Sequence, residues 1–329
     1  MIDDLANDTV AALRTIRRRP AAYLGAFALL TLGVGAVTLV FSLVRGVLLE
    51  SLPFAEPERL VSIWERSDEP GALTEEAPRR AKNVVSPANF LDWREQSETV
   101  EKMAAFAVTA ANLTEVGDPR RVRLGLVTEG YFETLGIEPE VGRLFAPEEM
   151  VADSGHPTTV LSHALWRTVF GEDPAVLGRR VQVDGRDLEV IGVMPPGVEL
   201  DMGEAAGTLG APADLWTPLP ITEQWSQRRG RWLLVVGRLG PGVSVDSASA
   251  ELDTIAERLA VEYPAFNEGW GVTVSGLHDH VTSTVRPTLL LLLGAVLLVL
   301  VIVCANATSL LLTRAAERSN EMRVRGALG

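Results

Sequence analysis

Two long apolar runs without any charged residue dominate the pattern of hydrophobic and polar positions along this 329-residue chain. They occupy Pro20–Val44 and residues 287–313. A helix rises 1.5 Å per residue, so about 24 residues span roughly 36 Å, more than the ~30 Å hydrocarbon core of a bilayer. The apolar part of a signal peptide is only about 7–15 residues long, and no small-residue cleavage site follows the first run. The pattern therefore predicts two transmembrane helices, at 20–49 and 287–313.

Between the two runs, apolar residues alternate with period 2 in some stretches and with helical spacing in others. Strands are predicted at "LVSIW", "RVRLGLVT", "RWLLVVGRL" and "WGVTVSGL". A helix is predicted to begin after Ser86, with Pro87 in its first turn, and to run through "ANFLDWREQSETVEKMAAF". A second helix is predicted from Val245 to Glu262, where one apolar stripe is formed by Leu252, Ile255, Ala256 and Leu259.

The middle of this segment carries clear turn signals. "RRVQVDGRDLEVIGVMPPG" predicts a hairpin around Asp184-Gly185, and "PTTVLSHALWRTVFG" predicts a strand followed by a helix that Ser162 caps. Residues 198–231 have little periodicity and are interpreted as loop-rich. The organisation expected for 50–286 is an α+β subdomain made of 50–136 and 226–286, with a β-rich subdomain at 137–225 inserted into it.

Arginines flank the two apolar runs on the sides that face away from the central segment. Four precede the first run (Arg14, Arg17, Arg18 and Arg19) and four follow the second (Arg314, Arg318, Arg323 and Arg325). The positive-inside rule then predicts that both termini are cytoplasmic, with residues 1–19 forming an amphipathic helix at the inner membrane surface, in contact with lipid. The fold class expected is a membrane protein in which two transmembrane helices flank an extracytoplasmic α+β domain.

The net charge of −13 is concentrated in that central part. Residues 1–20 carry +1 and residues 314–329 carry +2, which leaves −16 for residues 21–313. Nucleic-acid binding requires a basic surface, so an acidic domain argues against a nucleic-acid partner. Cys304 is the only cysteine, so no intramolecular disulfide is possible.

Motifs for chemistry are absent from the sequence. There is no G-x-S-x-G, no H-E-x-x-H and no G-x-x-x-x-G-K-[ST] phosphate loop, and the two lysines, Lys82 and Lys102, do not follow a glycine loop. ATP must therefore be bound by another polypeptide. His278 and His280 are two potential metal ligands, which is too few for a zinc site. We expect no enzyme activity, no metal and no cofactor.

Several stretches in family order resemble the MacB/FtsX-type ABC transporter permeases, and within these the long duplicated permeases of acidobacterial type. They include the N-terminal "LRTIRRRPAAYLGAFALLTLGVGAVTLVFSLVRGVLLESLPFAEPERLVSIWE", "SPANFLDWREQS", "VGRLGPGVSVDSASAELDTIAERLAVEYP" and the C-terminal "LLLLLGAVLLVLVIVCANATSLLLTRAAERSNEMRVRGALG". The resemblance implies a first transmembrane helix, a MacB-like periplasmic core domain at 50–286, and the start of an FtsX-like domain. Because two further spans follow in the family, the chain corresponds to the N-terminal part of a permease.

The resemblance also implies partners and a location. These permeases lie in the bacterial inner membrane, pair with a cytoplasmic P-loop ATPase and act as two permease halves, either a dimer or an internal duplicate. ATP hydrolysis moves the extracytoplasmic domain, a mechanotransmission that serves efflux or export in several members. In the family a cytoplasmic coupling helix rests against the ATPase, and here it maps to 314–329 with a charged face of Glu317, Arg318, Glu321, Arg323 and Arg325. An ordinary basic membrane anchor is the alternative for this segment.

Small residues in the first apolar run, Gly25, Gly33 and Gly35, would let another helix approach closely. Two other functions share the layout of span, domain and span. One is a two-span receptor with an extracytoplasmic ligand-binding domain, which would continue into a heptad-patterned signalling helix; "RAAERSNEMRVRGALG" shows no sustained heptad. The other is a membrane-anchored outer enzyme, for which no motif is present.

Overall fold

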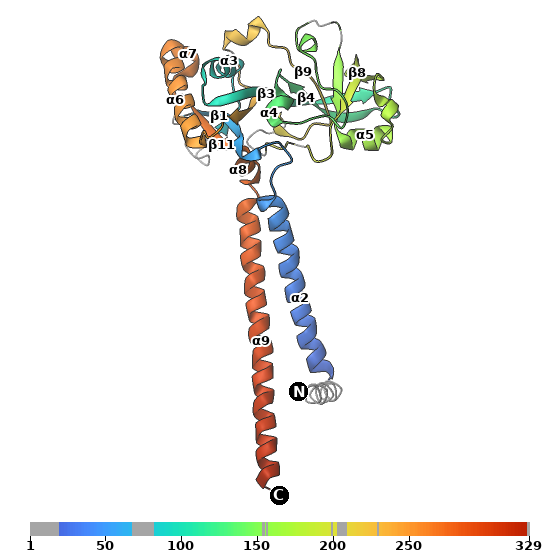
Figure 1. Ribbon diagram of the computed structural model, residues 1–329, viewed down its shortest axis with the longest axis vertical. Helices are drawn as coiled ribbons and strands as arrows, with labels where there is room; N and C mark the ends of the chain where they lie inside the picture. Colours follow the sequence, from blue (N-terminus) through green and yellow to red (C-terminus); the bar gives the residue numbers. More distant parts are fainter. Residues whose placement is uncertain are drawn as a thin grey trace. The chain divides into compact units, whose positions relative to one another are not determined.

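The computed structural model describes residues 20–327 except 68–81, 153–154, 156, 199, 203–208 and 229 (Figure 1). The chain divides into two compact units. One combines Met1–Glu50 with Thr282–Gly329 and is called the helical unit below; the other, Ser51–Val281, is called the sheet domain. The predicted helix at 1–19 lies outside the described residues.

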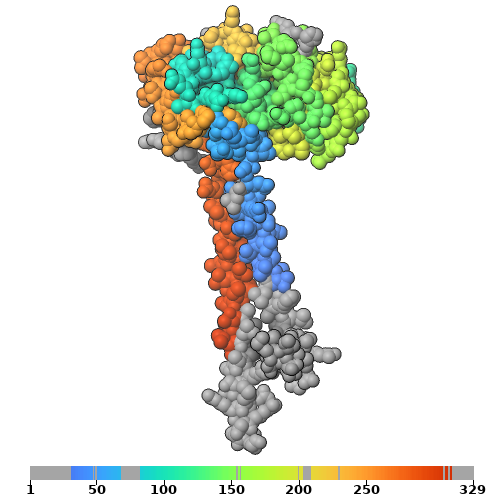
Figure 2. All heavy atoms as spheres, in the orientation of Figure 1, coloured from blue at the N-terminus to red at the C-terminus, as the bar shows by residue number. Residues whose placement is uncertain are grey.

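The helical unit contains two long helices, α2 (Pro20–Val44) and α9 (Arg286–Ala327), and a short π-helix, η1 (Arg45–Leu49). The two long helices pack along each other, as the space-filling view also shows for their described length (Figure 2). Within the described residues, Arg286–Asn306 is long and apolar enough to cross a membrane, whereas the apolar stretch Thr31–Val44 is shorter. Both predicted helices thus exist, and the use of either as a membrane span stays a prediction.

One mixed sheet runs through the whole sheet domain. Of the described strands, nine form a path and two lie beside it: β2 pairs with β1, and β7 pairs with β3 and β8. The path, in spatial order, is β11 (Trp270–Gly276), β1 (Leu60–Ser67), β10 (Leu234–Leu239), β3 (Val100–Thr114), β4 (Arg120–Val127), β9 (Leu215–Pro218), β6 (Thr158–Leu161), β8 (Arg186–Val193) and β5 (Val141–Gly142), with β2 at Lys82–Asn83 and β7 at Arg180–Val183.

Helices cover the two ends of this sheet (Figure 1). Near β1 and β11 lie α3 (Pro87–Gln96), α6 (Val245–Glu262) and α7 (Pro264–Asn267); near β8 lies α5 (His163–Phe170). Short helices α4 (Tyr131–Leu135) and α8 (Leu277–Thr282) follow β4 and β11. The 3₁₀ turns are η2 (Pro57–Arg59), η3 (Pro147–Glu149), η4 (Pro174–Val176) and η6 (Glu223–Gln227).

Strand β1 is buried along both of its faces because successive side chains point to opposite sides of a strand. Leu60 and Trp64 belong to one hydrophobic cluster, together with β10 and α4 residues. Val61 and Ile63 belong to a second, which contains the buried stripe of α6. A third cluster lies between α5 and the β7–β8 hairpin. Strand β1, the first strand after the helical unit, therefore contributes buried side chains to two of the three hydrophobic clusters.

Several local predictions are confirmed by the structure. The Ser162 hydroxyl caps α5 by accepting a hydrogen bond from the Leu165 amide at 3.1 Å. The β7–β8 hairpin turns at Asp184 and Gly185, whose φ angles of 46° and 77° suit a type I′ turn. Helix α6 has the predicted bounds, with Leu252, Ile255 and Leu259 buried.

Two predictions are wrong in part. The helix after Ser86 ends at Gln96, and β3 begins at Val100 within the stretch that was expected to be helical. The Glu251 carboxylate fixes this change of direction by accepting hydrogen bonds from the Ser97 hydroxyl and the Glu98 amide. Within the expected loop region 198–231, Leu215–Pro218 forms β9, which pairs in parallel with β4. The strands within 137–225 continue the same sheet as the rest of the sheet domain, so a separate inserted subdomain at 137–225 stays a prediction.

Candidate functional site

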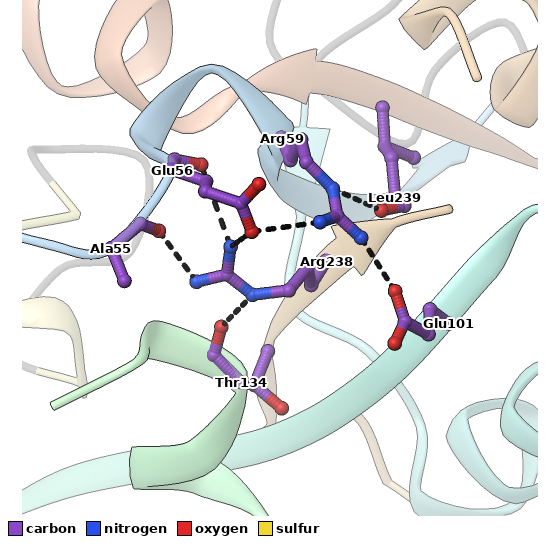
Figure 3. A network of polar contacts seen from close by, with 7 residues as sticks. All are labelled: Ala55, Glu56, Arg59, Glu101, Thr134, Arg238 and Leu239. Carbon is purple, nitrogen blue, oxygen red and sulfur yellow. Dashed lines mark hydrogen bonds and ion pairs between the residues drawn. The ribbon is translucent and has the colours of Figure 1, made fainter. Parts of the chain in front are cut away.

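The segment 51–59, which connects the helical unit to β1, is fixed to the sheet domain by a polar network (Figure 3). We call this the entry cluster: Glu56, Arg59, Glu101, Thr134 and Arg238, with the carbonyl groups of Ala55 and Leu239. Phe54, just before it, is buried in the same hydrophobic cluster as Leu60 and Trp64. The segment thus has an apolar anchor and a polar one.

Arg238 lies at the centre of the entry cluster, on β10, with only 6% of its surface exposed. Its guanidinium donates to the Ala55 carbonyl at 2.7 Å and to the Thr134 carbonyl at 2.9 Å, and lies 3.6 Å from the Glu56 carboxylate. Thr134 belongs to the last turn of α4, where the helix dipole favours a cation. Burial, and secondly the charge of Arg59, lower the pKa of Arg238. Arg238 therefore joins β10, α4 and the entry segment.

Arg59 adds a second bridge beside it (Figure 3). Its guanidinium donates to the Glu56 carboxylate at 2.7 Å and to the Leu239 carbonyl at 2.9 Å, and it pairs with the Glu101 carboxylate at the start of β3. Glu56 has a left-handed backbone, with φ 45°, which costs a residue with a side chain on the order of 1–2 kcal/mol. Contacts to both the carbonyl and the carboxylate of Glu56 hold it in that conformation.

The entry segment also touches the end of α4 directly. A Cβ atom on Gly136 would lie 2.6 Å from the Ala55 Cβ and 3.2 Å from the Arg238 Nη2, and Gly136 has φ +66° as the residue that ends the helix. Only glycine combines that conformation with so close an approach. The packing at the entry therefore depends on the close approach of Ala55 to the Gly136 backbone as well as on charge.

A second network fixes the segment by which the chain leaves the sheet domain. We call it the exit cluster: Trp64, Lys82, Met202, Ser275 and His280. His280, on α8, is buried; its Nδ1 lies 2.7 Å from the Lys82 Nζ and its Nε2 lies 3.0 Å from the Met202 carbonyl. Its ring packs on that of Trp64, with centroids 4.9 Å apart, and Lys82 also donates to the Ser275 hydroxyl at 2.9 Å.

The two clusters lie on either side of β1. β1 is paired with β11 over seven residues on one side and with β10 on the other, so the strand that follows the entry segment lies between the strand that carries Arg238 and the strand that precedes α8. Leu277, the first residue of α8, is fully buried in the same hydrophobic cluster as Phe54. The entry segment and the start of α8 therefore both contribute to one hydrophobic cluster.

The coupling-helix and helix-packing residues that the sequence predicts lie in the helical unit. Glu317, Arg318, Glu321, Arg323 and Arg325 belong to the C-terminal part of α9, an unbroken helix whose side chains there lie outside the described ones. Gly33 is buried against α9, where an added Cβ would meet Leu300 at 3.5 Å, whereas Gly35 has nothing within 4 Å. Gly25 lies in α2 outside the described side chains.

Sequence reasoning missed Arg238, although a signal existed. Arg238 is the one charged residue in "LLVVGRL", a run otherwise apolar enough to be buried, and a charge in such a strand needs partners. The two histidines of "LHDHV" are on α8, and His280 packs inside the domain. Within the described residues, no group of three or more His, Cys, Asp or Glu side chains could hold a metal ion.

The structure is similar to those of two solved extracytoplasmic domains. The periplasmic region of MacB from Actinobacillus actinomycetemcomitans aligns with a TM-score of 0.46 and 15% identity, covering 75% of this chain and 97% of that one. The extracellular domain of the noncanonic ABC-type transporter YknZ from Gram-positive bacteria aligns with a TM-score of 0.45 and 18% identity, covering 65% and 99%. No curated protein matches the sequence. The family model described as the MacB-like periplasmic core domain matches residues 25–255.

Proposed function

The chain belongs to the family of the MacB-like periplasmic core domain, the extracytoplasmic domain of ABC-type transporter permeases, and on that premise we propose that it transmits movement from its membrane helices to this domain. It acts in a permease subunit that works with a separate cytoplasmic ATPase. Hydrolysis by that ATPase shifts the membrane helices, and the sheet domain follows the shift to drive efflux or export.

One observation supports this proposal: the segment that enters the sheet domain and the segment that leaves it each place a buried residue in the same hydrophobic cluster. Phe54 on the entry side and Leu277 on the exit side share a hydrophobic cluster, and Arg238 on β10 and His280 on α8 add polar contacts. A domain that only had to be displayed outside the membrane could be tethered by flexible linkers. If helix movements are to reach the sheet domain, both connecting segments must be anchored in it.

The proposed location is the bacterial inner membrane, with both termini in the cytoplasm and the sheet domain outside it. The orientation follows from the arginines that flank the two apolar runs. In this orientation the C-terminal part of α9 lies on the ATPase side. A second permease half, from another copy or from a duplicated segment, completes the assembly. Gly33 already packs against α9 of the same chain, whereas an added Cβ at Gly35 would have nothing within 4 Å, which leaves room there for a further helix.

Charge reversal in the C-terminal part of α9 tests the coupling. We expect that a full-length permease with Arg318→Glu, Arg323→Glu and Arg325→Glu, purified from its native host, carries about one tenth or less of the P-loop ATPase that the parent permease carries. The reason is that a mixed-charge helix recognises its partner largely through charge complementarity. The measurement is the amount of co-purified ATPase per permease.

The matched control reverses three arginines of the sheet domain that are exposed, Arg120, Arg121 and Arg186. Equal recovery of the ATPase with both triple variants would contradict the coupling role of 314–329. A full-length permease that never binds an ATPase would remove the proposal altogether and favour a two-span receptor.

A further inference from the structure

The contact between Lys82 and His280 in the exit cluster has a definite hydrogen-bond direction. A lysine ammonium group can only donate, so the His280 Nδ1 at 2.7 Å must accept. The proton of the neutral ring then lies on Nε2, which donates to the Met202 carbonyl at 3.0 Å. Both ring nitrogens are thus engaged, and this arrangement exists only for the neutral imidazole.

A second proton on the ring would face the lysine directly. Protonated Nδ1 has no lone pair, so two positive donors would oppose each other at 2.7 Å, with His280 buried and Lys82 half-buried. The Trp64 ring on the third side is apolar and almost fully buried, and its centroid is 4.9 Å from that of His280. The contact with Lys82 must therefore break before the buried ring can carry a charge.

The charged groups around His280 can be named for the described part of the chain. The elements packed against it contribute Lys82 from β2, uncharged Trp64 from β1, uncharged Ser275 from β11, and the Met202 carbonyl beside the exposed Asp201. On α8 itself, His278 and Asp279 precede His280, and the Asp279 carboxylate is directed towards Gly276, where an added Cβ would lie 3.4 Å from its Oδ2. Of these described groups, Lys82 is the one whose charge lies in direct contact with a ring nitrogen.

We propose that the Lys82–His280 contact is an acid-sensitive fastening, which releases α8 from the sheet domain when the medium outside the membrane becomes mildly acidic. The proposal rests on the proposed function, because it assigns a regulation to the exit cluster. Release of α8 would remove one of the two attachments through which helix movement reaches the sheet domain. Acid outside the membrane then lowers the mechanical coupling without unfolding the domain.

The sign of the pH dependence follows from linkage. Burial, and secondly the charge of Lys82, lower the pKa of His280 below its ordinary value of 6.5. The released state therefore binds more protons, so the fastening is fully present above about pH 6.5 and is lost as the pH falls from there towards the folded pKa. Burial also lowers the pKa of Lys82, but an ammonium group loses its proton as the pH rises, so acidification keeps Lys82 charged and the loss of the contact in acid comes from His280.

The test uses the full chain in lipid nanodiscs and amide hydrogen exchange of α8, with rates divided by the intrinsic chemical rate at each pH. The opening of α8 should increase about tenfold for each pH unit below about 6.5, until the folded pKa is reached. Exchange within α6 (Val245–Glu262) should stay constant over the same range and serves as the internal measure of global unfolding.

Three variants separate the explanations. His280→Gln should abolish the rise, whereas His278→Gln, two residues away on the same helix, should retain it. Lys82→Met should raise the pKa of His280, read from the ring signal of isotope-labelled histidine, because the neighbouring cation is gone. Since the histidine titration is measured in the parent chain as well, the test does not depend on the stability of any variant.

Constant α8 exchange in the parent chain, or a His280 pKa at or above 6.5, would overturn the proposal. So would the same rise in His280→Gln, since the proton would then act elsewhere. None of these readouts involves an ATPase, so a failure here is distinguishable from a failure of the proposed function, which is decided by ATPase co-purification.

Discussion

Replacing Arg238 by methionine is expected to lower the free energy of unfolding of the sheet domain by about 2–4 kcal/mol. The Thr134 carbonyl is in a fully buried residue and loses its charged donor, while the more exposed Ala55 carbonyl can bind water instead. Methionine keeps an apolar stem of similar length, so packing around the side chain is largely retained. The loss should therefore report mainly the polar contacts of the entry cluster.

The same change should loosen the entry segment more than the rest of the domain. Glu56 adopts its left-handed backbone while held by Arg238 and Arg59, and without Arg238 one of these two restraints is gone. We expect faster amide exchange in residues 54–59 than in α6. Arg121→Met, at an exposed position of β4, should change stability by less than about 0.5 kcal/mol and provides the control.

Thermal or urea unfolding of the full chain in detergent, followed by tryptophan fluorescence, measures the stability change. Equal stability of Arg238→Met and Arg121→Met would mean that the buried guanidinium only offsets its own desolvation cost. In that case the entry cluster would define the geometry of the entry segment without stabilising the sheet domain. Its proposed part in transmitting movement would then have no basis in stability.

Elements with strong local signals could be predicted from the sequence. The apolar stripe of α6, the Ser162 cap and the Asp184-Gly185 turn each depend on residues within one or two turns of the chain, and each has the predicted form. The error after Ser86 has a different origin. The helix stops at Gln96 because Glu251, which is 154 residues away from Ser97, binds the turn that starts β3.

Strand β9 shows the same limit. Leu215–Pro218 is only four residues long, too short for a period to be visible, and becomes a strand because β4 and β6 lie on its two sides. The candidate site was less predictable still. Arg238 and His280 obtain their partners from residues 55, 134, 82 and 202, which only the tertiary fold brings together. Sequence could flag Arg238 as a buried charge, but not which segment it fastens.

Replacing Gly192 by alanine is expected to destabilise the β5 end of the sheet by about 2–4 kcal/mol. Gly192 on β8 is paired with Gly142 on β5, and a Cβ at position 192 would lie 2.3 Å from the carbonyl oxygen of Arg143. That atom belongs to the backbone and cannot turn aside. The strands must move apart, which strains the packing and weakens the hydrogen bond from the Arg143 amide to the Ile191 carbonyl, now 2.9 Å long.

The position of Gly192 also makes this variant informative about transmission. β5 and β11 are the two ends of the strand order, and the entry and exit clusters involve β1, β10 and β11. Amide exchange should therefore accelerate in β5–β8 and leave β1 and β11 unchanged. Gly276→Ala is the control, because the nearest atom to its added Cβ is 3.4 Å away, an ordinary contact. Equal acceleration across all strands would instead mean that the sheet opens as one cooperative unit, so that a displacement applied at β1 is carried through to β5.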